Sequence, residues 1–247
     1  MNLQEQIIRE VKKIGNGAHI FTPKEWIGEK VIIVRTQKKS LKERILKILE
    51  PHLGSIKGVY LYGSYSRNEE TKDSDIDLLV ITNNRINIKE KGFEVISLEE
   101  GKLEDAIKIS PLLIYSAISE ATPIINTELL KLIKEKYKIK KENFKQYIKE
   151  TKSIININKE LLDPYSIILR LRGIFIIKGL LNNHDYSNKK FKEWILKNCR
   201  NVDIENLLEA YNKIKRENKI IKVKQKDLEK ILQFLEKETI KLERKLK

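Results

Sequence analysis

The stretch YGSYSRNEETKDSDIDL, residues 62–78, decides the fold of the chain. An apolar run ends at Tyr62 and is followed by a Gly-Ser turn, and an Asp-x-Asp pair then opens a second apolar run. Gly63 has no Cβ, so an anion can approach the backbone closely there, and Ser64 adds a hydroxyl group. A short helix expected from Tyr65 would point free N–H groups outward, and such helix starts bind phosphate. The stretch therefore predicts a phosphate-binding turn between two strands.

Two aspartates share one face of the second expected strand. Side chains alternate along a strand, so Asp75 and Asp77 point the same way, while Ile76 and Leu78 face a core. Carboxylates one pleat apart can chelate a hard cation, and Mg²⁺ prefers a few carboxylates, with waters and substrate phosphates completing its shell. Two such ions can clamp the attacking and leaving oxygens of a phosphoryl displacement. The pair predicts Mg²⁺ (or Mn²⁺) beside the phosphate turn.

A third carboxylate and a basic side chain complete the candidate site. Glu94 alternates with Phe93 and Val95 in a further expected strand, so it can bind the second metal or accept the proton of an attacking hydroxyl. Arg67 follows the turn and carries a forked guanidinium suited to phosphate oxygens. The loop offers rival carboxylates that are less well aimed: Glu69, Glu70 and Asp73.

The order Gly63-Ser64 followed by Asp75-x-Asp77 resembles the DNA polymerase beta-like nucleotidyltransferase superfamily, whose signature is Gly-Ser, a short spacer and Asp-x-Asp. It looks most like the small prokaryotic "minimal nucleotidyltransferase" branch. The resemblance covers about residues 40–125, a third of the chain. It implies an α+β fold with a mixed sheet and flanking helices.

The resemblance also implies an activity. A nucleoside monophosphate would move from ATP, or another nucleoside triphosphate, to a hydroxyl, with release of pyrophosphate. Asp75 and Asp77 would bind Mg²⁺, and Arg67 stands close to the usual basic position. Glu94 departs from the family, whose third carboxylate is more often Asp. Relatives of this type adenylylate a partner protein, modify antibiotics or extend RNA. The alternative is a DNA-binding or antitoxin-like regulator whose transferase domain is catalytically silent and only senses nucleotide.

Residues 1–36 read as a separate small β element. Short strands are expected at 7–14, 18–21 and 30–35, with a strong turn signal in Gly15-Asn-Gly. The order VKKIGNG…TPKEWIG…VIIV resembles the AbrB-like swapped-hairpin family, which implies a homodimer of interleaved strands and a possible DNA contact. Strands this short cannot bury themselves, so pairing with a second copy or docking as a hairpin cap on the catalytic domain is expected. The element has few basic side chains for DNA: Lys12, Lys13, Lys24 and Arg35.

Two further domains are expected: the catalytic domain over 40–125 and a helical substrate- or partner-binding domain over 126–247, with the cleft between them. The helical domain reads as a bundle with short loops. Arg170 and Arg172 lie in its most apolar segment, where each either points to the cleft or forms a buried ion pair. The expected helices are 127–138, 141–161, 164–182, 187–199, 203–218 and 225–246.

Composition bounds the class of protein. A chain of 247 residues that is 40% hydrophobic can form a substantial core. No run of 18 uncharged apolar residues is present and no signal pattern begins the chain, so no membrane span and a cytoplasmic location are expected. The single Cys199 excludes a disulfide framework. Heavy use of Lys, Glu and Ile is typical of a thermophile, although an AT-rich genome favours the same codons for Lys and Ile.

The net charge of +15 is unevenly placed. Basic and acidic side chains cancel in residues 1–128, so the whole excess lies in residues 129–247. Such segregation favours an acidic protein or a nucleic acid as acceptor or partner over a small cationic drug. The solvated faces of Lys-rich helices would give the same count without any partner.

Overall fold

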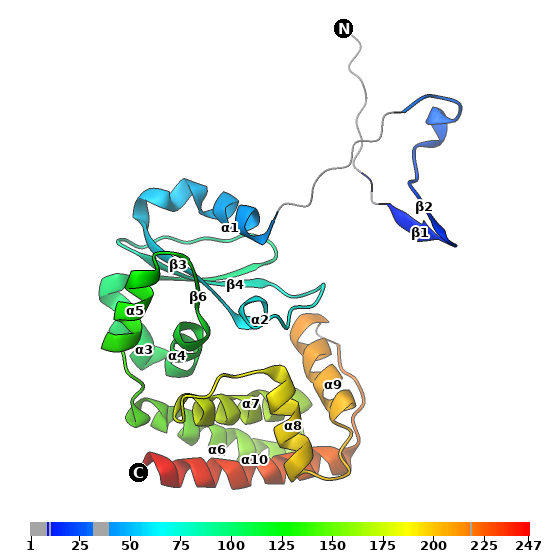
Figure 1. Ribbon diagram of the computed structural model, residues 1–247. Coiled ribbons are helices and arrows are strands. Elements are labelled where there is room, and N and C mark those ends of the chain that lie inside the picture. Colours follow the sequence, from blue (N-terminus) through cyan, green and yellow to red (C-terminus); the bar gives the residue numbers. More distant parts are fainter. Residues whose placement is uncertain (1–8, 10, 32–39, 218) are drawn as a thin grey trace. The chain divides into compact units, whose positions relative to one another are not determined.

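The computed structural model describes residues 9, 11–31, 40–217 and 219–247 (Figure 1). It divides the chain into two compact units, Met1–Ser40 and Leu41–Lys247. No described helix is long and apolar enough to cross a membrane.

The N-terminal unit contains one hairpin. Strand β1 (Lys12–Ile14) pairs antiparallel with β2 (Gly17–His19), and Gly15 takes a φ of 50° in the turn between them. A 3₁₀ turn, η1 (Lys24–Trp26), follows Pro23. The first expected strand is thus seen only at its end, and positions 32–35 of the third lie outside the described residues. None of the residues described between 9 and 31 is buried.

The second unit is built on a four-stranded mixed sheet, which confirms the expected fold class. Strand order is β5-β4-β3-β6, from β3 (Ile56–Tyr62), β4 (Ile76–Thr82), β5 (Phe93–Glu99) and β6 (Thr122–Ile125). β3 runs antiparallel to β4 and β6, whereas β4 and β5 are parallel. β-branched and aromatic residues fill these strands, as suits a pleated surface buried on both faces.

Helices cover both faces of the sheet (Figure 1). Helix α1 (Leu41–Leu49) packs on one face through Ile45, against Leu78 and its neighbours. The other face, which includes Leu79, packs on α3 (Leu103–Ile109) and α4 (Pro111–Glu120). Strand alternation explains the division, because successive residues of β4 point to opposite faces. The remaining elements of this half are η2 (Glu50–Ser55), α2 (Gly63–Ser66), η3 (Glu100–Lys102) and α5 (Thr127–Lys136).

A helical region completes the second unit. Helix α7 (Pro164–Leu180) lies at its centre and packs on α4, α6, α9 and α10. Asp163 accepts hydrogen bonds from the first N–H groups of α7, and Pro164 suits the first helical position. The core of this region is continuous with the α4 side of the sheet. Its other elements are η4 (Lys141–Phe144), α6 (Lys145–Leu161), α8 (Asn188–Asn198), α9 (Ile204–Glu217) and α10 (Gln225–Leu246).

The two arginines of α7 have different environments. Arg170 forms an ion pair with Glu150 of α6 at 3.3 Å and lies over the ring of Tyr147. Arg172 instead contacts aromatic side chains of α9 and of the loop before α8, and its Nε is buried without a hydrogen-bond partner. Arg170 therefore forms the expected ion pair with a neighbouring helix, but the pair is not buried, because the Glu150 side chain is 47% exposed.

Candidate active site

The Gly-Ser turn is shaped by crowding against Asp77. Gly63 follows β3 with a φ of 71°, a conformation that residues with a side chain rarely adopt. A Cβ added at this position would collide with the carboxylate of Asp77. The backbone N–H of Ser64 donates a hydrogen bond to the same carboxylate. The conformation of the turn and the position of the Asp77 carboxylate therefore depend on each other.

Asp77 has an unusual electrostatic environment. It lies opposite Tyr62 of β3 and, in register, opposite Glu94 of β5. Burial and the charge of Glu94 raise the pKa of Asp77 to about 6, although Lys215, Arg67 and the Ser64 N–H oppose the rise. Burial, together with these carboxylates, also raises the pKa of the Tyr62 hydroxyl. Two carboxylates that repel each other are held side by side by the sheet.

The other predicted carboxylates are less enclosed. Glu94 is exposed and shares the face of Asp77, because the two are in-register partners of parallel strands. Asp75 is exposed and immediately precedes β4. Across the described ranges, no three His, Cys, Asp or Glu side chains come together to hold a metal ion by themselves. A cation here would need substrate oxygens or water to complete its shell, as is usual for Mg²⁺.

Helix α9 supplies a cation to the site from far along the chain. The ammonium of Lys215 lies close enough to Asp77 to oppose the rise of its pKa, and the side chain is otherwise exposed. In the sequence this lysine stands out only as one member of a basic cluster with Lys213 and Arg216. Its nearness to the carboxylates depends on how the bundle packs on the sheet, which no local pattern reports.

The guanidinium of Arg67 is bound to protein carboxylates and is not free to bind phosphate. Its Nε donates to Glu69 at 3.0 Å, and its Nη1 donates to Glu120 at the end of α4. The guanidinium also lies over the ring of Tyr186, 5.0 Å from the centroid. Glu120 in turn accepts the backbone N–H of Gly63. The structure thus brings Gly63, Ser64 and Asp77 into direct contact, and it surrounds Arg67 with carboxylates.

Two sequence relatives each match part of this chain. A protein of Methanocaldococcus jannaschii named "Putative protein adenylyltransferase MJ0604" is 38% identical over 45 residues, which is 18% of this chain and 45% of the relative. A second from the same organism, "Putative protein adenylyltransferase MJ0128", is 43% identical over 54 residues, 22% of this chain and 46% of the relative. Each match therefore spans less than half of the relative's length.

A solved structure shares the fold. The spectinomycin adenyltransferase AAD(9) of Enterococcus faecialis, crystallised with ATP and spectinomycin, superimposes with a TM-score of 0.50 at 14% identity. The superposition covers 80% of this chain and 97% of that chain.

Family comparisons divide the chain at the same place as the structure. Residues 2–35 match a family described as "Putative transposon-encoded protein (DUF2080)". Residues 42–178, more than half of the chain, match the family described as "Nucleotidyltransferase domain". The chain therefore belongs to the nucleotidyltransferase family.

Proposed function

We propose that this protein transfers AMP from ATP to a hydroxyl group of an acceptor and releases pyrophosphate. The observation that carries the proposal is the geometry of Asp77, which is packed against the Gly63 turn, paired in register with Glu94 and approached by Lys215. This arrangement supports the proposal, because Asp77 and Glu94 could bind a cation while Lys215 could bind phosphate. The adenylyltransferase names of the sequence relatives favour ATP as the donor.

The carboxylates fit a divalent metal ion. Burial and the charge of Glu94 raise the pKa of Asp77, so a cation bound beside these carboxylates would stabilise the ionised form. We assign Asp77 and Glu94 as ligands of Mg²⁺ (or Mn²⁺). Asp75, the third predicted ligand, does not come together with them as a three-carboxylate cluster in the described part of the chain. When bound, the ion would supply charge neutralisation at the triphosphate.

The residues of the chain divide the remaining work. Gly63 lets the triphosphate approach the backbone, the Ser64 hydroxyl and the Lys215 ammonium bind phosphate oxygens, and Glu94 is the candidate to accept the acceptor's proton. The acceptor oxygen attacks the α-phosphorus, the bond from that phosphorus to the bridging oxygen breaks, and pyrophosphate leaves with the bond's electrons. The hydroxyl proton passes to the carboxylate and then to solvent. Positioning and charge supply most of the rate in such reactions.

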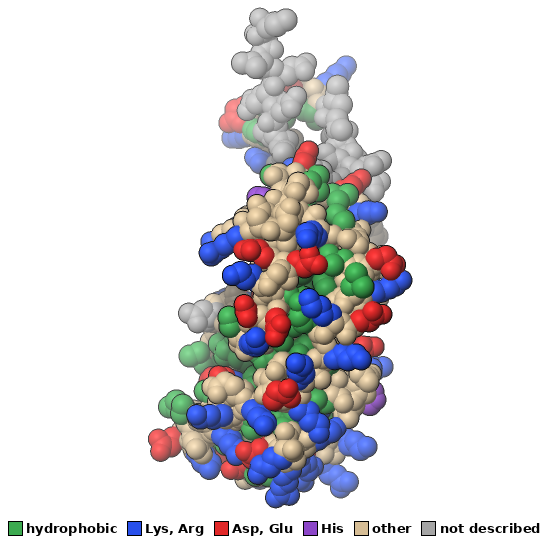
Figure 2. Space-filling view, turned by 90° about the vertical axis from the view of Figure 1, so that its left-hand side faces the viewer, with side chains coloured by type: hydrophobic (Ala, Val, Ile, Leu, Met, Phe, Trp, Pro, Cys, Tyr) green, Lys and Arg blue, Asp and Glu red, His purple; other side chains and the backbone are tan. Residues whose placement is uncertain are grey.

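A protein hydroxyl is our proposed acceptor. The names of the relatives say that they modify proteins, and the excess of basic side chains suits an acidic partner. Blue side chains gather at the lower end of the surface in Figure 2, where α6 and α10 lie in Figure 1. The carboxylates of Glu69 and Glu120 are engaged by Arg67, which leaves them less available to a small cationic drug. The alternative acceptor is a nucleic acid, and the test below distinguishes the two.

The test uses the full chain, cell extract, Mg²⁺ and ATP labelled at the α-phosphate or, separately, at the γ-phosphate. The proposal predicts a protein band labelled only from the α position and lost in Asp77→Asn. Asp105→Asn is the matched control, because Asp105 is an exposed carboxylate on α3. A labelled RNA would move the acceptor to nucleic acid. Label from the γ position, or no Mg·ATP binding, would overturn the activity and favour a silent, regulatory domain.

For the N-terminal element we propose self-association into a homodimer in the manner of AbrB-like hairpins. The support is that its described residues bury no side chain, so the strands lack a core of their own. The match to a family under another description leaves this assignment to experiment.

A further inference from the structure

The guanidinium of Arg67 is fully engaged within the protein. Its fork reaches Glu69 and Glu120, its face lies over Tyr186, and its side chain is only 12% exposed. An arginine that binds phosphate needs free N–H groups directed at the phosphate oxygens. Here two carboxylates neutralise the positive charge of Arg67 and accept its N–H groups. The side chain therefore supports the structure of the site and does not bind the phosphate itself.

These partners fix the backbone of the phosphate turn. Glu120 accepts the N–H of Gly63 through its carboxylate, and its main-chain oxygen accepts from the Ser66 hydroxyl at 2.7 Å. Glu69 accepts the N–H of Asn188, the first residue of α8, at 2.9 Å. The short α2 is therefore tied to the end of α4 and to the start of α8, with Arg67 between the two carboxylates.

The same contacts continue to the helix that carries Lys215. Arg172 of α7 also lies over the Tyr186 ring, 4.9 Å from its centroid, and its guanidinium interacts electrostatically with Tyr186 and Tyr211. Tyr211 is on α9, one helical turn before Lys215, so the two side chains share a face of that helix. Contacts made by Arg67 and Arg172 thus connect the phosphate turn to the helix that carries Lys215.

We propose that Arg67 is a positioning residue that sets the separation between the phosphate turn and Lys215. It acts through a set of contacts that we call the Arg67 network. The inference rests on the proposed function, since the nucleotide would lie between the turn and the lysine. Displacements of about 1 Å can cost about 100-fold in rate, so rigid placement of both sides is required. The members of the network are Glu69, Glu120, Tyr186, Arg172 and Tyr211.

The substitution Arg67→Lys separates positioning from direct phosphate binding. Lysine keeps the positive charge and binds phosphate as a point charge, so a direct phosphate contact would be largely preserved. It cannot reproduce the planar fork between two carboxylates or the stacking on Tyr186. The Arg67 network predicts a loss of Mg·ATP affinity in Arg67→Lys as large as in Arg67→Gln.

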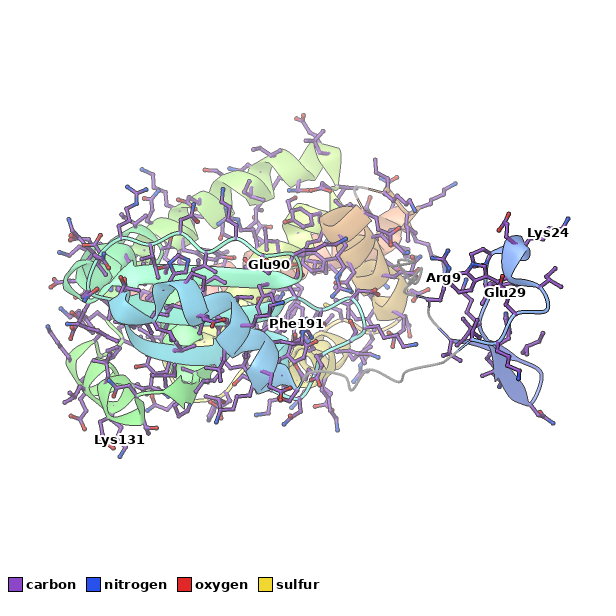
Figure 3. All side chains as sticks on the ribbon, turned by 90° about the horizontal axis from the view of Figure 1, so that it is seen from above. Arg9, Lys24, Glu29, Glu90, Lys131 and Phe191 are labelled. Atoms are coloured by element: carbon purple, nitrogen blue, oxygen red, sulfur yellow. The ribbon has the colours of Figure 1, made fainter. Side chains whose placement is uncertain are left out.

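A double-mutant cycle on Mg·ATP affinity tests the inference without any acceptor. Calorimetry on the full chain compares wild type, Arg67→Lys, Lys215→Ala and the double variant. We expect each single change to weaken binding by about 10-fold and the double by about 10- to 20-fold, because both remove one coupled arrangement. The control is Lys131→Ala, since Lys131 is an exposed lysine that extends from α5 into solvent (Figure 3).

The outcomes separate the two proposals. Independent effects that multiply to about 100-fold, or full affinity in Arg67→Lys, overturn the positioning role while the proposed function stands. A wild-type protein that binds no Mg·ATP overturns the proposed function and this inference together. If Arg67→Lys does not fold, Glu69→Gln takes its place in the cycle, because it removes one of the two charged partners of Arg67 and weakens the contact to Asn188.

Discussion

The N-terminal hairpin and the central sheet both contain paired strands, yet only the sheet has an interior. In the hairpin Ile14 is 61% exposed, and nearby Phe21 is 68% exposed. In the sheet Leu79 and Ile81 are completely buried. The difference is that β4 has a strand on each edge and helices over both faces, whereas β1 has only β2 among the described residues. Side chains such as Lys24 extend freely from the N-terminal unit (Figure 3).

This comparison teaches that alternation predicts a strand but not a core. A strand is stabilised by its neighbours, and two short strands do not supply enough of them. Precise chemistry needs side chains held by packing, so we place the catalytic residues in Leu41–Lys247 and give the N-terminal unit a role in association. The following four experiments can break or sharpen that division.

The largest effect is expected for Asp77→Asn. The change keeps the shape beside Gly63 but removes the charge that would bind metal, so transfer should fall on the order of 10³-fold. Initial rates with α-labelled ATP measure it, and circular dichroism checks that the fold is retained. A comparable loss on removal of residues 1–40 would contradict the division, because the chemistry would then depend on both units.

Truncation of one apolar side chain in each unit compares their interiors directly. Leu79→Ala should cost about 2–5 kcal/mol of unfolding free energy, because it leaves a cavity under α4. Ile14→Ala should change the unfolding of the second unit by less than about 0.5 kcal/mol, as expected for an exposed site. Denaturant titration of both variants gives the values. Equal losses would mean that the hairpin shares a core with the sheet.

The charge of Asp77 should destabilise the second unit as pH rises. Its pKa is about 6 in the folded protein against an ordinary value of 3.8, so the folded state binds the extra proton between these pH values. Stability contributed by that proton is present below about pH 4 and is lost as pH rises through about 6, by up to about 3 kcal/mol.

The check is the difference in unfolding free energy between Asp77→Asn and wild type at pH 4 and pH 7. The variant should gain relative to wild type at pH 7, and added Mg·ATP should stabilise wild type alone. Mg·ATP affinity of wild type should also decline below about pH 6 as Asp77 takes up its proton. Parallel pH profiles for the two proteins would show that Asp77 is not perturbed.

The smallest effect on nucleotide binding is expected from deletion of residues 1–40. Mg·ATP affinity should stay within about 2-fold, because the family match and both cores lie in the second unit. The mass from light scattering should fall from that of a dimer to that of a monomer of the shortened chain if the hairpin is the dimer contact. An unchanged mass would remove the AbrB-like assignment without affecting the catalytic unit.

Regular elements were predictable because their signals are local. The alternation in β4 marks this strand in the sequence, and α10 has the predicted bounds. Alternation also predicts the face of Glu94. The direct pairing of Glu94 with Asp77 was not predicted, since it depends on the parallel register of β4 and β5.

The side chains that surround the site could not be predicted from local sequence patterns, because they come from distant parts of the chain. Arg67 and Glu120 are 53 positions apart in the chain, and Glu69 and Asn188 are 119 apart. Long charged side chains carry no periodic signal that identifies such partners. The same limit applies to Lys215, whose meeting with Asp77 follows from the packing of α9 on α7.

The collision between a Cβ at position 63 and the Asp77 carboxylate couples the two positions in sequence space. In a library randomised at both, glycine should be the only residue at 63 among active clones that keep aspartate at 77. Larger residues at 63 should be recovered only with a shortened and inactive residue at 77. In a related protein that has lost its activity, both residues could therefore be replaced together. The presence of glycine at 63 with aspartate at 77 is then the pattern expected where selection has maintained catalysis.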